Sequence, residues 1–106
     1  MFGPHLMLDC YECDKDKLGN QRLILKFLKE TPKKLGMHII KEPSIVSYDY
    51  NSETWDNGGV SAIVIIAESH ISIHTFPNND GFMSVDMFSC KEFDIEKVIS
   101  IINKEF

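Results

Sequence analysis

Two apolar runs, VSAIVIIA (60–67) and HISIHTF (70–76), are separated in this chain by only two residues, Glu68 and Ser69. The second run alternates apolar and polar residues, which is typical of a strand with one buried face. A connection this short joins antiparallel strands, because a parallel pair needs a crossover of a dozen or more residues. The two runs therefore predict a hairpin that carries a carboxylate, a hydroxyl and an imidazole, Glu68-Ser69-His70, at its turn.

The flanking segments add further strands and two helices to this hairpin. Alternating or apolar segments predict three more strands, at residues 4–13, 37–50 (interrupted at Pro43) and 82–90. Residues 13–36 show helical spacing, with Asp14 or Asp16 as the cap and a break or kink at Thr31-Pro32. A second amphipathic helix is predicted over 92–106, capped by Asp94 and buried through Ile95, Val98, Ile99 and Ile102.

This order of elements predicts the fold class. Two helices on one face of an antiparallel sheet form a two-layer α+β sandwich. With 106 residues and no internal repeat or linker, the chain is expected to be a single domain, 1–106.

Composition excludes several classes of protein. The net charge of −5 argues against a nucleic-acid partner and is compatible with a cationic substrate. The longest apolar run is shorter than the roughly 18 residues of a membrane span, so no membrane association is expected. The start, MFGPHLMLDC, lacks the basic region of a signal peptide, and three cysteines are an odd number. We therefore expect a cytoplasmic protein with free thiols.

Strand geometry argues against two metal or redox sites. His70 and His74 share a face but lie about 13 Å apart along a strand, so they cannot hold one ion, and no metal is expected. Cys10 and Cys13 are three residues apart, which places them on opposite faces of a regular strand. They would converge only if a loop intervened, and no second Cys/His pair is present for zinc.

Ser69, His74 and Asp86 supply the side chains of a Ser-His-Asp hydrolase. The serine lacks the Gly-x-Ser-x-Gly turn that exposes the nucleophile in one large hydrolase class. The adjacent Glu68 would also oppose a developing oxyanion. From composition and spacing alone, the simplest interpretation is a polar, partly buried strand end whose serine and histidine satisfy each other.

ESHISIHTFP, followed by GFMSVDMFSC, closely resembles the short prokaryotic S-adenosylmethionine decarboxylases, which are pyruvoyl enzymes made by self-cleavage. The shared features are a Glu-Ser-His cleavage site, an Ile-His-Thr-aromatic-Pro segment and an Asp-x-Phe-Ser/Thr-Cys ending. GVS (59–61) stands eight residues before the cleavage serine, and GPHLMLDCYECD is similar to the opening strand of the family. The resemblance covers nearly the whole chain and implies the same sandwich, paired as a homodimer.

The resemblance implies that the chain cleaves itself between Glu68 and Ser69. Ser69 would attack the carbonyl of Glu68, and the resulting ester would break by β-elimination. The products would be a chain of residues 1–68 and a chain of residues 69–106 that begins with a pyruvoyl group. This group would replace an external cofactor by forming a Schiff base with the amine of an α-amino-acid substrate.

Three more residues match positions of the family that take part in the chemistry. His74 matches an acid/base group that assists processing, and Ser61 matches a processing residue that hydrogen-bonds the oxygen of the intermediate. Cys90 matches the proton donor, and a thiol suits that task because its pKa lies near neutrality.

Substrate-binding residues also follow from the resemblance. Trp55 and Phe76 are candidates to stack on an adenine, and Asp9 aligns with an acidic residue that could face a cationic ligand. The family has a glutamate after the proline of the His-Thr-aromatic-Pro segment, where this chain has Asn78. That difference favours a second hypothesis, an arginine or ornithine decarboxylase on the same scaffold. A non-enzymatic alternative is an uncleaved binding module that retains the fold.

Overall fold

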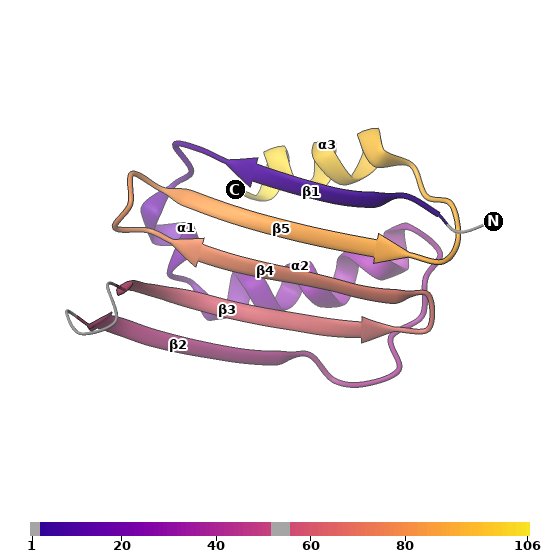
Figure 1. The fold of residues 1–106 in the computed structure, drawn as a ribbon, viewed down its shortest axis with the longest axis horizontal. Coiled ribbons are helices and arrows are strands. Elements are labelled where there is room, and N and C mark those ends of the chain that lie inside the picture. The colour runs from indigo at the N-terminus through magenta and orange to yellow at the C-terminus, as the bar shows by residue number, and fades with distance from the viewer. Residues whose placement is uncertain (1–2, 52–55) are drawn as a thin grey trace.

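Five strands form one antiparallel sheet, and all the helices of the described residues lie on one face of it (Figure 1). The computed structural model describes residues 3–51 and 56–106. The order of strands across the sheet is β1-β5-β4-β3-β2. The elements are β1 His5–Cys10, α1 Lys15–Leu18, α2 Gln21–Lys34, β2 Ser44–Asn51, β3 Asp56–Ile66, β4 Ser69–Phe76, β5 Phe82–Ser89 and α3 Ile95–Glu105. The predicted α+β sandwich is confirmed.

The helices begin at capping residues, as the sequence predicts, but the first helical segment is divided in two. Asp14 caps α1 by accepting from the backbone of Asp16 and Lys17, and Asn20 caps α2 by accepting from Leu23. Asp94 caps α3. None of these helices, within the described residues, is long and apolar enough to cross a membrane.

The predicted break at Thr31-Pro32 is wrong. Pro32 lies inside α2, which continues to Lys34, so the helix accommodates the loss of one backbone donor two residues before its end. The carbonyl of Pro32 instead accepts from the N–H of Met37 at 2.8 Å and of Leu35 at 3.1 Å. The proline therefore helps to close the C-terminal turn of the helix.

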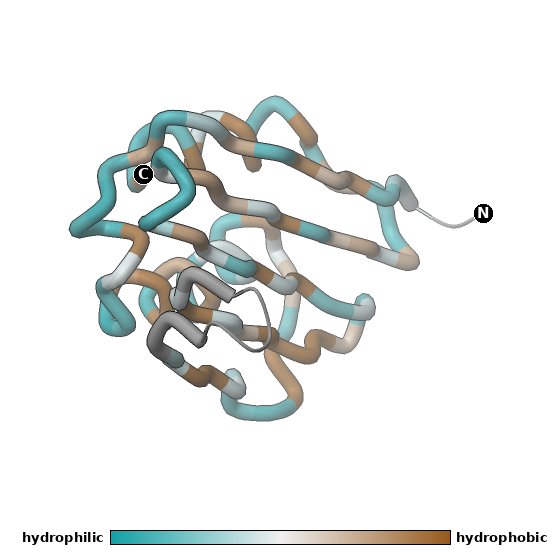
Figure 2. The backbone as a smooth tube through the Cα atoms, turned by 60° about the vertical axis from the view of Figure 1, so that its left-hand side comes forward, coloured by the Kyte–Doolittle hydropathy of each residue, from teal (hydrophilic) through white to brown (hydrophobic). Residues whose placement is uncertain are grey.

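The core lies between the helices and the inner face of the sheet. Figure 2 shows apolar and polar residues alternating along the strands. The helices contribute Ile24, Phe27, Leu28, Val98 and Ile102, all buried. Ile95, expected on the buried face of α3, is 37% exposed because it is the first residue of the helix. The buried apolar residues of the strands are Val60, Ala62, Val64, Ile66, Ile71, Ile73, Met83, Val85 and Met87.

The opposite face of the sheet, which we call the open face, is not covered by any helix of the described residues (Figure 1). Alternation places His70, Ser72 and His74 of β4 on it, since Ile71 and Ile73 are buried in the core. Four apolar side chains on this face are also exposed: Met7, Val46, Ile63 and Ile65. An open face that mixes polar and apolar side chains is suited to contact with another molecule.

Pairing between β3 and β4 positions the Gly-Val-Ser segment. Ser61 lies opposite His74, and Val60 lies opposite Thr75. Gly59 has φ 147, and a Cβ atom there would lie 1.9 Å from the carbonyl oxygen of Thr75. Only glycine allows the two backbones to approach so closely.

Candidate functional site

The Glu68–Ser69 bond lies at the tight turn between β3 and β4. Ile66 pairs with Ser69, so the connection consists only of Ala67 and Glu68. Ser69 has φ 138, a backbone conformation that residues with a side chain rarely adopt. Such a conformation costs about 1–3 kcal/mol and persists only where its surroundings impose it. The strain falls on the residue that the sequence marks for cleavage.

The carbonyl of Glu68 receives a hydrogen bond from the next strand of the sheet. Ser69 also pairs with Ser89, the last residue of β5. Cys90 follows directly, and its backbone N–H donates to the Glu68 carbonyl oxygen at 2.7 Å. A fixed donor at a carbonyl stabilises negative charge that develops on the oxygen when a nucleophile attacks. The structure thus brings Glu68, Ser69 and Cys90 together.

The side chain of Glu68 is held as well. Its carboxylate accepts from the backbone N–H of His38 at 3.1 Å and lies 3.1 Å from the Nδ1 atom of the same residue. The backbone hydrogen bond from His38, followed by the side-chain one, holds the pKa of Glu68 below its usual value. His38 was not among the residues that the sequence marked, because it precedes Glu68 by thirty positions and belongs to no motif.

Ser61 and His74 form a second pair, on the open face. The Ser61 hydroxyl and the Nδ1 atom of His74 are 2.8 Å apart. Both side chains line a cavity of about 420 Å³ on this face. An imidazole beside a hydroxyl can accept or release a proton there.

Within one chain, His74 lies far from Ser69. The two residues are five positions apart on β4, which is about 16 Å along an extended strand. The Glu68–Ser69 bond with Cys90, and the Ser61–His74 pair, are therefore two separate groups within one chain.

Asp86 belongs to a third cluster, and the Ser69-His74-Asp86 triad does not form. One carboxylate oxygen of Asp86 lies 2.7 Å from Nε2 of His5, and the other lies 2.8 Å from Nε2 of His70. Burial raises the pKa of Asp86, but hydrogen bonds from His70 and His5 outweigh it, and the net shift is downward. The cluster joins β1, β5 and β4 on the open face. Sequence alone cannot reveal it, because it depends on the registers of two strand pairs.

The candidate substrate-binding residues lie around the far end of β4. Trp55 lies outside the described residues. The ring of Phe76 lies 5.8 Å from that of Phe82, centroid to centroid. Asp9 is exposed on the open face opposite Ser84, and Asn78 is exposed in the turn after β4. These positions are about 20 Å along the strand from Ser69 of the same chain.

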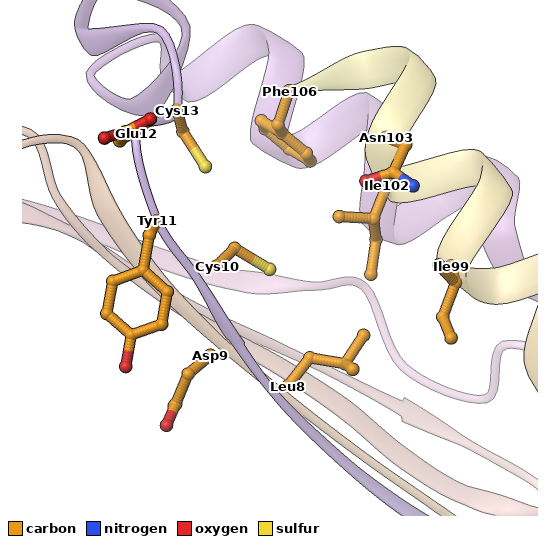
Figure 3. A pocket seen from close by; sticks show the side chains of 10 residues that line it. All are labelled: Leu8, Asp9, Cys10, Tyr11, Glu12, Cys13, Ile99, Ile102, Asn103 and Phe106. Atoms are coloured by element: carbon orange, nitrogen blue, oxygen red, sulfur yellow. The ribbon is translucent and has the colours of Figure 1, made fainter.

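Cys10 and Cys13 depart from the strand geometry expected of them. β1 ends at Cys10, and Glu12, with φ 55, bends the chain, so both thiols point into one cavity of about 400 Å³ beside α3 (Figure 3). Asp9 and Tyr11 point away from the helix in the same view. Burial raises the pKa of both thiols, which keeps them in the less reactive protonated form. Within the described residues, no group of three or more potential ligands is placed to hold a metal.

Comparison with known proteins assigns the family. The fold is an antiparallel α+β sandwich that carries a strained serine directly after a two-residue hairpin loop. The family model for S-adenosylmethionine decarboxylase then matches residues 4–106, and the chain belongs to this family.

Three curated relatives support the assignment, and each of the three is named S-adenosylmethionine decarboxylase proenzyme. The Thermotoga petrophila protein is 37% identical over 90 residues, which cover 85% of this chain and 62% of the relative. The Caldicellulosiruptor saccharolyticus protein is 36% identical over 90 residues, covering 85% and 65%. The Clostridium botulinum protein is 31% identical over 103 residues, covering 96% and 81%. The chain thus spans less than two thirds of the length of the first two relatives.

The Asp86 cluster predicts a dependence of stability on pH. The pKa of Asp86 is lower in the folded chain than its ordinary value of 3.8, so the unfolded chain binds more protons between these values. Stability should therefore be complete above the ordinary value and should fall as pH drops through the lower, folded one. Asp86→Asn should show a shallower fall in the free energy of unfolding below about pH 4, measured by urea denaturation. Glu96→Gln, at an exposed carboxylate of α3, is the control, and equal slopes in all three proteins would contradict the assignment.

Proposed function

We propose that this chain is a self-processing decarboxylase of S-adenosylmethionine that makes a pyruvoyl group from its own Ser69. The observation that carries the proposal is the arrangement at the Glu68–Ser69 bond. A strained serine follows a carbonyl whose oxygen already accepts a hydrogen bond from Cys90 at 2.7 Å. The family match supports the same activity. The product would serve as the aminopropyl donor for spermidine synthesis.

Cleavage would begin with attack of the Ser69 hydroxyl oxygen on the carbonyl carbon of Glu68. The Cys90 N–H would stabilise the oxyanion, and the amide nitrogen would take up a proton as the C–N bond breaks. The ester would then lose the Cα proton of residue 69, and its Cβ–O bond would break to release the Glu68 carboxylate. Addition of water to the remaining dehydroalanine and loss of ammonia would leave the pyruvoyl group. Breaking the peptide bond would also release the backbone strain at Ser69.

The residues around the bond fit a pyruvoyl group at position 69. Such a group supplies a ketone beside an amide carbonyl, which accepts the electrons released when a carboxylate leaves as carbon dioxide. Cys90, an exposed thiol one residue beyond β5, would return a proton to the substrate α-carbon. Asp9 and Phe76 lie about 20 Å along the strand from Ser69 of their own chain. They would therefore reach this site only from a second copy, where Asp9 would attract the cationic part of the substrate and Phe76 would stack on its aromatic part.

A second copy of the chain would complete the site. His74 and Ser61 lie too far along the sheet to assist their own Ser69, yet they occupy the open face. Two copies packed through their open faces would bury the exposed Met7, Val46 and Ile63. A two-fold axis near the middle of the face would bring the far end of β4 in one copy over the cleavage turn of the other. We therefore propose a homodimer in which each Ser69 is served by the partner's His74.

Cleavage is the first expected outcome. The purified protein should separate on a denaturing gel into chains of residues 1–68 and 69–106, and mass spectrometry should identify a pyruvoyl group on the second. Ser69→Ala should remain one chain of 12.2 kDa, because it lacks the nucleophile. Ser72→Ala, on the same strand, is the control and should be cleaved normally. An intact wild-type chain would exclude the pyruvoyl mechanism and favour the binding-module alternative.

The second prediction is that two variants with impaired cleavage restore it when they form a mixed dimer. His74→Ala alone should cleave at least roughly tenfold more slowly, since it lacks an acid/base group typically worth 10²–10⁴-fold. When it is co-folded with Ser69→Ala, the His74→Ala chains should regain cleavage in mixed dimers, because their intact Ser69 meets the partner's His74. The two proteins can be distinguished by mass. If co-folding restores no cleavage, His74 does not act across the dimer.

The third prediction concerns which substrate is decarboxylated. The cleaved protein should release carbon dioxide from carboxyl-labelled S-adenosylmethionine and not from arginine or ornithine. Asn78 stands where the family has glutamate, so Asn78→Glu should lower KM for S-adenosylmethionine severalfold by adding an acceptor for ribose hydroxyls. Release from arginine or ornithine alone would support the second hypothesis instead.

A further inference from the structure

The loop between α2 and β2 is attached directly to the cleavage turn. The carbonyl of His38 accepts from the N–H of Ala67 at 2.7 Å, and the N–H of Ile40 donates to the carbonyl of Ile65 at 3.2 Å. Ile39 forms a bridge with Ile66, the last residue of β3. Residues 38–40 therefore pair with the end of β3 through an isolated β-bridge beside the turn.

The two residues that precede this bridged segment, Gly36 and Met37, are held by hydrogen bonds of their own. The N–H of Met37 donates to the carbonyl of Pro32 in the last turn of α2 at 2.8 Å. The ammonium group of Lys91 donates to the carbonyl of Gly36 at 3.0 Å. Because α2 and the segment after β5 both hold residues 36–37, His38 is presented from a rigid part of the fold.

His38 and Cys90 hold the same residue at two different points. The Glu68 side chain is only 11% exposed, and its two carboxylate oxygens lie 3.1 Å from the backbone nitrogen and from Nδ1 of His38. The Glu68 carbonyl oxygen accepts from Cys90 on the other side. Fixing the side chain and the carbonyl of one residue restricts rotation of the peptide plane between them. That plane contains the carbon that Ser69 would attack.

We propose that His38 is a positioning residue for self-cleavage, which acts by holding the Glu68 carboxylate and thereby orienting the Glu68–Ser69 peptide. This inference rests on the proposed function and extends it to a residue outside the cleavage motif. It also gives a role to Glu68 itself, which touches no reacting atom through its side chain. After cleavage the same contacts would keep the end of the first chain beside the new N-terminus of the second.

Two substitutions at position 38 distinguish the effect of the side-chain hydrogen-bond donor from the effect of side-chain size. The Nδ1 atom of histidine and the Nδ2 atom of asparagine are both bonded to Cγ, so His38→Asn can present an N–H at nearly the same place. His38→Leu has similar bulk and no donor. Both retain the backbone N–H. The imidazole is 76% exposed, so neither substitution should disturb the core.

The experiment follows cleavage of the full chain by pulse labelling during cell-free synthesis. His38→Leu should cleave roughly threefold to tenfold more slowly, because a hydrogen bond to a charged group is lost. His38→Asn should stay within about twofold of wild type. Lys41→Met, a neighbouring exposed position, should match wild type. Unfolding by urea in a Ser69→Ala background should be cooperative for both variants, with His38→Leu modestly less stable because it loses a side-chain hydrogen bond that lowers the pKa of Glu68.

The possible failures are distinct. If wild type cleaves and His38→Leu cleaves at the same rate, His38 does not position the bond and the proposed function stands. If His38→Asn is as slow as His38→Leu, the donor is not what matters, and the inference is wrong. If wild type remains whole, the proposed function fails, and this inference fails with it.

Discussion

The register between β4 and β5 is the constraint on which the candidate site depends. Because Ser69 is paired with Ser89, the first residue beyond β5 is brought beside the Glu68 carbonyl. A slip of one residue would reverse the faces of every β5 side chain and expose Met83, Val85 and Met87. The packing of the core therefore fixes the register, and the register fixes the hydrogen bond from Cys90 to the Glu68 carbonyl.

The two faces of the sheet differ in composition and in what they contribute to the protein. The inner face buries aliphatic side chains against α2 and α3 and supplies stability. The open face carries the Ser61–His74 pair and the three-residue cluster around Asp86, and each pair in these clusters crosses from one strand to the next. Such cross-strand pairs can be precise only because the inner face holds the strands in register.

Periodicity and motifs predict much of this protein from its sequence. The alternation in HISIHTF correctly assigns Ile71 and Ile73 to the core and His70 and His74 to the other face. Local rules fail where the chain departs from regular geometry. Pro32 was expected to break a helix but lies close enough to its end to be accommodated. A bend at Glu12 brings together two thiols that a regular strand would separate.

The contacts of the site itself are harder to predict, because they join distant parts of the chain. The hydrogen bonds between His38 and Glu68 span thirty residues, and those of Asp86 with His5 span eighty-one. Glu68 and Asp86 lie within motifs, but nothing in the local sequence of either residue indicates which distant residue it contacts. Only the registers of the sheet, which depend on all five strands, reveal that they meet.

The order of strands has a consequence for a chain cut after Glu68. The first product would contain β1, β2 and β3, and the second would contain β4 and β5. In the sheet, β5 and β4 lie side by side in the middle, with β1 on one flank and β3 and β2 on the other. The shorter product would thus be interleaved with the longer one, and two full ladders of hydrogen bonds would have to open before it could leave. Such a heterodimer would assemble readily only while it is one chain, so the uncut precursor would act as its own template, and separated products would face a slow encounter between two incomplete sheets.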